Sequence, residues 1–152
     1  MIGIAVVASE LPVHLLSEVA DRLHDRAGCL EARFDWFHNP ALLPVKWDGA
    51  LRFLRWGSRE RRSPLPIGSS LTKSQVEAGV IAGLEDAVIP ASFGLHHGTW
   101  FLIEEGIRAA VVPDARGGPV AYMLMEPSTN YYRNMTGQSK LMPVLVLVNQ
   151  TI

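Results

Sequence analysis

Apolar positions in the first third of the chain recur with two different spacings. A continuous apolar run covers residues 1–8 and predicts a buried strand. Between residues 9 and 23, leucine, valine and alanine recur every three or four positions, with Ser9 as the expected N-cap and Gly28 as a stop signal, which predicts a helix. Residues 30–37 and 50–56 alternate apolar and polar side chains, which is the period of a half-buried strand.

The second half of the chain begins with a helix signal and then turns to strand patterns. Thr72 and Gln75 form a capping box, which predicts a helix running to about Leu84. Short apolar runs separated by turn residues then predict strands at residues 87–89, 99–103, 107–112, 120–125 and 143–148. In the last run we expect either Leu145 and Leu147, or else Val144, Val146 and Val148, to face the core. The pattern indicates one domain over residues 1–152, of the α+β class, with antiparallel strands dominating.

Composition narrows the class of protein. The content of hydrophobic residues, 48%, is ample for a core, and the single cysteine, Cys29, which we expect to be a small buried hydrophobe, has no internal partner for a disulfide. The net charge of −1 argues against bulk attraction to nucleic acid or acidic membranes. The longest apolar runs fall short of the roughly 20 residues of a membrane span, and no Lys or Arg precedes the first run. We therefore expect a cytoplasmic protein with no membrane partner.

The five histidines form no recognisable metal or catalytic set. His14 and His24 lie ten residues apart in the predicted first helix, and His96 and His97 would point in opposite directions in an extended strand. No His-x-x-x-His motif, cysteine pair or acidic cluster accompanies them, so we expect neither a metal nor another cofactor. A histidine titrates near neutrality, which leaves His97 and His38 as candidate general bases without an identifiable partner.

Arginines concentrate around one tryptophan in the middle of the chain. Guanidinium groups hold phosphates and an indole stacks on a base, so this pairing suits single-stranded nucleic acid. The alternative is a solvated loop in which Glu60 softens the charge, and the position of Trp56, exposed or buried, discriminates between the two. The candidate nucleic-acid-binding residues are Arg52, Arg55, Trp56, Arg59, Arg61 and Arg62.

Four short motifs, taken in order, resemble those of the SOS response-associated peptidase (SRAP) family. A fifth and weaker match is Ala32-Arg33-Phe34 leading to Pro40. The motifs are Arg55-Trp56-Gly57; Val88-Ile89-Pro90-Ala91-Ser92-Phe93-Gly94 followed by Trp100; Gly118-Pro119-Val120-Ala121-Tyr122 through Glu126; and Leu141-Met142-Pro143-Val144-Leu145. The resemblance implies a mostly antiparallel, curved or barrel-like sheet with two main helices.

The same resemblance implies a lost reaction. The family begins Met-Cys-Gly-Arg, and the amine and thiol of its cysteine trap the aldehyde of an abasic site in single-stranded DNA. Here Ile2 stands in place of that cysteine. The family's Asn-Ala-Arg falls near residues 68–70, its glutamate near His97 or Gly98, and its histidine at about Ser139, which adds Ser139 to the catalytic candidates. The resemblance therefore implies a degenerate member that keeps the fold and drops the chemistry.

Taken together, the sequence predicts a non-catalytic SRAP-like domain that binds single-stranded nucleic acid or a protein partner. One alternative is a structural, oligomeric or regulatory protein, assembled through the apolar C-terminal strand. The other is an enzyme of different chemistry that uses His97 or His38. The oligomeric state stays open.

Overall fold

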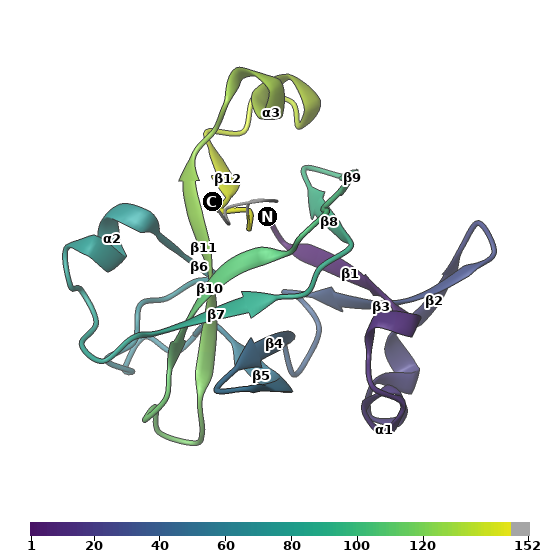
Figure 1. Cartoon of the computed structure of the whole chain (residues 1–152). Helices are drawn as coiled ribbons and strands as arrows, with labels where there is room; N and C mark the ends of the chain where they lie inside the picture. Colours follow the sequence, from purple (N-terminus) through teal and green to yellow (C-terminus); the bar gives the residue numbers. More distant parts are fainter. Residues whose placement is uncertain (147–152) are drawn as a thin grey trace, which may run out of the picture.

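The computed structural model describes residues 1–146, and the strands among them form two sheets (Figure 1). The first sheet has five strands, all paired antiparallel with their neighbours. In spatial order they are β2 (Leu23–Arg26), β3 (Cys29–Asp35), β1 (Gly3–Val7), β8 (Phe93–His96) and β9 (Thr99–Leu102). The hairpin of β2 and β3 projects from one side of the molecule in Figure 1.

The second sheet closes on itself. Its strands follow the order β10 (Ile107–Val112), β7 (Glu85–Ile89), β4 (Leu42–Trp47), β5 (Ala50–Trp56), β11 (Val120–Pro127) and β12 (Leu141–Pro143), with β6 (Ser70–Thr72) paired to β11. Because β10 also pairs with β11, the five strands β10, β7, β4, β5 and β11 form a closed barrel. Only the β11 pairings with β5 and β6 are parallel in the described residues. The predicted α+β class with mostly antiparallel strands is confirmed.

Helical segments are short throughout the described residues. The predicted helix over residues 9–23 is divided into η1 (Ala8–Glu10), α1 (Val13–Leu16) and η2 (Ser17–Arg22), because Pro12 caps α1 and the backbone of Val19 leaves the helical region. α3 (Asn130–Met135), with Thr129 as its N-cap, is a helix that the sequence pattern did not predict. No helix within residues 1–146 combines the length and apolar character needed to cross a membrane.

The predicted capping box is confirmed, although its helix ends early. The Thr72 hydroxyl accepts a hydrogen bond from the Gln75 N–H, and the Gln75 side chain accepts one from the Thr72 N–H. The helix, α2 (Lys73–Glu77), ends well before the predicted Leu84. The reason is Gly79, whose φ of 70° lies in the left-handed region that terminates helices.

Two apolar clusters form the core. The larger fills the barrel and continues under the first sheet, and includes Ile4, Phe34, Val45, Trp56 and Met123. The smaller lies on the other face of β11, includes Leu71, Tyr122 and Val144, and is covered by Val76 of α2. β11 is therefore buried on both faces, which explains why its sequence is almost continuously apolar.

Three details differ from the sequence predictions. Cys29 is exposed rather than buried, because it follows the Ala27-Gly28 turn between β2 and β3, where both turn residues have positive φ. His24 lies in β2 and not in a helix. Near the C-terminal end, Val144 is buried in one cluster while Leu145 packs against the other, so adjacent residues both contact apolar groups. Leu147 and Val148 lie outside the described residues.

Candidate functional site

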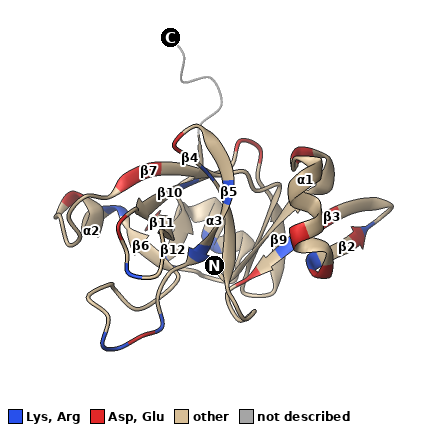
Figure 2. Ribbon diagram, turned by 90° about the horizontal axis from the view of Figure 1, so that it is seen from below, with Lys and Arg blue, Asp and Glu red and all other residues tan. Residues whose placement is uncertain are grey.

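A large groove lies between the loop that follows β5, the β10–β11 hairpin and residues 38–41. Its volume is about 1250 Å³. Two acidic residues, Glu60 and Asp114, line it together with four arginines, Arg55, Arg59, Arg62 and Arg116. Figure 2 shows the loop after β5 as a basic stretch broken by one acidic position. Basic side chains therefore outnumber acidic ones on this surface, although the whole chain carries a net charge of −1.

The loop after β5 is fixed at its neck. Ser58 and Gly68 exchange two backbone hydrogen bonds, with N···O distances of 3.1 and 2.7 Å. Gly57 makes this closure possible, because a Cβ at that position would lie 2.0 Å from the Gly68 carbonyl oxygen. The positive φ of Gly57 also suits glycine. The closed neck holds Arg59 and Arg62 beside the β10–β11 hairpin.

Trp56 lies at the foot of the groove but belongs to the core. Only 2% of the residue is exposed, and its indole N–H donates a hydrogen bond to the Ser69 carbonyl at 2.8 Å. Alternation along β5 explains this placement, because Leu54 and Trp56 point into the barrel whereas Arg55 points outward. The indole of Trp56 has no free face on which a base can stack, which favours a structural role for this residue.

A different tryptophan contacts an arginine of the groove. The Arg59 guanidinium carbon lies 4.1 Å from the centroid of the half-buried Trp36 ring, and Trp36 contacts Trp56 edge to face at 5.8 Å. Sequence reasoning missed Trp36, because it ends a different strand pattern 20 residues before Trp56. It also missed Arg116, whose only signal was a basic residue in a predicted turn.

The remaining predicted arginines divide into three groups. Arg55 donates hydrogen bonds to the carbonyls of Arg116 and Gly118 at 2.9 and 2.6 Å, so it braces the β10–β11 hairpin. Arg52 lies outside the groove, 3.9 Å from Asp48. Arg61 is exposed but does not line the groove, unlike its neighbour Arg62. The groove thus gathers Arg55, Trp56, Arg59 and Arg62 of the six predicted residues.

Two of the three catalytic candidates, His97 and Ser139, both contact His96, whereas His38 lines the groove. Ser139 is buried and lies with its Oγ 3.1 Å from Nε2 of His96, a histidine that sequence reasoning did not single out. His97 is exposed, and its ring stacks on that of His96 with the centroids 4.6 Å apart. The two histidines are expected to point in opposite directions if the strand is extended, but His97 has a φ of 49° and leaves the extended conformation, so their rings face each other. His38 is half-buried and lies 3.8 Å from Asp21.

His96 lies in a chain of hydrogen bonds with Tyr132 and Ser139. Burial lowers the pKa of His96 to about 4, assisted by the positive charges of the nearby N-terminal amine and of His97. Burial also raises the pKa of the Tyr132 phenol, so both groups are neutral near pH 7.

One proton arrangement satisfies every member of this chain. The Tyr132 O–H donates to Nδ1 of His96, Nε2–H of His96 donates to the Ser139 oxygen, and the Ser139 O–H donates to the Leu141 carbonyl at 2.8 Å. In that arrangement the Ser139 proton points away from the imidazole, so His96 does not activate the hydroxyl. A nucleophilic serine instead donates its O–H to the histidine that acts as the base. The geometry is that of a brace between β8, α3 and the segment before β12.

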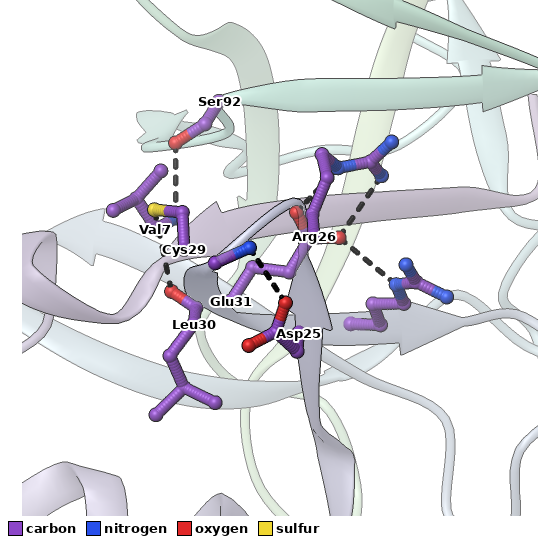
Figure 3. Close-up of polar contacts among 9 residues, drawn as sticks. Val7, Asp25, Arg26, Cys29, Leu30, Glu31 and Ser92 are labelled. Carbon is purple, nitrogen blue, oxygen red and sulfur yellow. Dashed lines mark hydrogen bonds and ion pairs between the residues drawn. The ribbon is translucent and has the colours of Figure 1, made fainter.

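A buried charge lies in the first sheet. Glu31 of β3 is almost fully buried, and Arg26 holds its two oxygens at 2.6 and 2.9 Å while Arg33 adds a third bond at 2.9 Å (Figure 3). Burial alone raises the pKa of Glu31, but the hydrogen bonds and charges of the two arginines outweigh burial and hold the pKa below its usual value. This cluster links β2 to β3 and is fully paired.

Within residues 1–146, no group of three or more His, Cys, Asp or Glu side chains is placed to hold a metal ion. No family model, curated protein or solved structure matches the chain. The function is therefore inferred from the groove and from the two polar clusters.

Proposed function

We propose that this chain is a binding domain without chemistry of its own, and that it holds single-stranded nucleic acid in the arginine groove. The observation that carries the proposal is the contact of Arg59 with Trp36 at the edge of a groove that also presents Arg62 and Arg116. A guanidinium held against a ring keeps its N–H groups for phosphate and offers its outer face to a base.

A single strand suits this groove better than a duplex. Stacking on a guanidinium or indole needs an unpaired base with a free face, and grooves of this kind combine such platforms with basic residues that follow the backbone. The low net charge of the chain provides no long-range attraction, so affinity depends on the local arginines. Binding is therefore expected to be strongly salt-dependent and limited to a few phosphates.

The His96 brace supports the non-catalytic part of the proposal. A buried, neutral imidazole whose two nitrogens are both engaged has no free position for a substrate proton. The motif order that resembles the SRAP family agrees with a single-stranded ligand, and Ile2 lacks the thiol of that family's reaction. A role in the SOS response follows from the resemblance alone. We expect no covalent adduct with abasic-site DNA, and a band shift that resists SDS and heat would contradict the proposal.

Fluorescence anisotropy with labelled 30-nucleotide DNA and RNA, and with a 30-base-pair duplex, tests the binding itself. We expect the single strands to bind more tightly than the duplex. The double variant Arg59→Ala, Arg116→Ala should weaken binding and reduce the slope of log K against log salt by about 0.7 for each lost phosphate contact. Arg108→Ala is the matched control, because Arg108 is exposed on β10 and lies near Asp86, outside the groove. Absence of single-strand binding by the wild type at low salt would refute the proposal.

A further inference from the structure

A second cavity lies between β9, the turn that follows it, α3 and the segment after β12. Its volume is about 440 Å³, within the range of ligand pockets, and its wall includes Phe101, Met135 and Met142. Two large side chains at its rim are unusually exposed, Leu102 at 66% and Tyr131 at 77%. Exposed apolar groups beside an apolar hollow are typical of an interaction site.

β9 is also an open edge of the first sheet. The Ile103 N–H donates to the Ser92 carbonyl at 2.9 Å, so the backbone groups of Ile103 face β8. Backbone groups alternate sides along an antiparallel strand, so the N–H and C=O of Leu102 and Trp100 point to the open side. Among the described residues, neither makes a backbone hydrogen bond beyond the sheet. The edge is therefore free to accept another strand there.

Negative charge at one end of this cavity favours a ligand with basic groups. Glu104 and Glu105, separated from β9 by Ile103 alone, line the cavity and are exposed. No Lys, Arg or His lines the cavity, and neither glutamate has an ion-pair partner within residues 1–146. A ligand with basic groups at one end fits this distribution.

We propose that β9 accepts an extended segment of a partner protein as an additional strand, with apolar side chains in the cavity and basic residues against Glu104 and Glu105. In this mode of recognition, backbone hydrogen bonds supply affinity and a pocket for alternate side chains supplies specificity. Residues 147–152 carry no basic side chain that could pair with the two glutamates. The site is separate from the arginine groove and does not depend on the proposed nucleic-acid ligand.

A fluorescein-labelled, end-capped octapeptide that alternates valine with threonine and ends in two lysines is a suitable probe for anisotropy with the full chain. The wild type is expected to bind it. Leu102→Pro removes the outward N–H without breaking the ladder to β8, and proline is tolerated on edge strands. This variant should weaken binding about tenfold, the equivalent of one backbone hydrogen bond. Leu102→Ala keeps the N–H and should weaken binding less, and melting temperatures verify that both variants fold.

Two further arms test charge and strand addition. The double variant Glu104→Gln, Glu105→Gln should weaken binding of the lysine probe but not of a probe with glutamine in place of lysine. Glu10→Gln with Glu18→Gln, two exposed acids far along the chain from this site, is the control and should change nothing. A probe N-methylated at alternate amides should lose affinity.

Four outcomes would overturn the proposal. The first is no binding by the wild type, and the second is equal binding of the N-methylated probe, which indicates a pocket ligand without strand addition. The third is binding that appears only in Leu147→Asp, which makes the C-terminal residues of the chain the occupant. The fourth is a concentration-dependent dimer that competes with the probe, which assigns the edge to a second copy.

Discussion

Two of the regions in which arginine contacts aromatic rings differ in what neutralises the charge of the arginine. In the five-stranded sheet, Arg26 lies 4.7 Å from the centroid of Trp100 and forms two hydrogen bonds with the buried Glu31. In the groove, Arg59 lies 4.1 Å from the centroid of Trp36. No carboxylate comes within ion-pair distance of Arg59 in the described part of the chain.

The difference shows that an arginine next to an aromatic residue in sequence does not by itself define a binding surface. A guanidinium that shares a buried carboxylate has already used its best donors, and its ring contacts stabilise the fold. A guanidinium stacked on a ring without a carboxylate keeps its donors for a ligand. We therefore assign the Arg26 cluster to structure and the Arg59 groove to binding.

The largest effect is expected at Trp56, beneath the groove. Trp56→Ala removes a buried indole and its hydrogen bond to Ser69, so it should lower the free energy of unfolding by about 3–5 kcal/mol. Urea denaturation measures this loss. If the variant is as stable as the wild type and only nucleic-acid binding falls, Trp56 belongs to the binding surface and its assignment to the core is wrong.

The His96 brace should make stability depend on acidity. In the folded chain the pKa of the His96 imidazole is about 4, below its ordinary value of 6.5. The unfolded chain therefore binds the proton more readily, and the free energy of unfolding decreases as pH falls from 6.5 to 4. The difference between the two pKa values corresponds to a loss of about 3 kcal/mol in the free energy of unfolding. Urea denaturation at several pH values measures the slope of the free energy of unfolding against pH.

Matched variants assign the slope to His96. His96→Gln should reduce the slope, whereas His14→Gln, at an exposed position of α1, should leave it unchanged. An equal slope in all three proteins would remove His96 as its origin. The carboxylate of Glu31, whose folded pKa is lowered, adds its own loss only at more acidic pH.

The two arginines at the centre of the comparison should respond differently to the same substitution. Arg26→Ala leaves Glu31 buried with Arg33 as its remaining partner. Because Arg33 stays and Arg26 is 27% exposed, we expect a loss of about 2 kcal/mol, below the 3–5 kcal/mol of a fully buried pair. Arg59→Ala should cost less than about 0.5 kcal/mol, as is usual for an exposed position. Urea denaturation measures the free energy of unfolding of both variants, and equal losses would contradict the distinction between the two regions.

Local pattern predicted much of the fold. The alternation of residues 50–56 and the apolar run of residues 107–112 coincide with β5 and β10, and the capping box at Thr72 begins α2. β4 was missed because Pro44 interrupts its pattern, and β8 because it contains Gly94 and follows the Pro90 turn. Those strands are defined by their partners across the sheets rather than by their own period.

The candidate site was predicted only in part, because its geometry is tertiary. The sequence located the arginines of the loop after β5, since a charge run is visible in one dimension. It left open which face of β5 points into the barrel, and this direction decides that Trp56 is buried. Arg116 comes to the groove from the β10–β11 hairpin, and Trp36 contacts Arg59 from the end of β3. The link between His96 and Ser139 spans 43 positions.

The smallest expected effect comes from two adjacent residues of the groove loop. Arg62 lines the groove and Arg61 does not, although both are exposed. If the groove holds a single strand, Arg62→Ala should lower affinity and reduce the salt slope by about 0.7, the counterion released by one phosphate contact. Arg61→Ala removes the same charge outside the groove and should leave the slope unchanged. Anisotropy titrations at four salt concentrations resolve such a difference. Equal slopes for the two variants would mean that charge near the loop, rather than contact within the groove, attracts the strand.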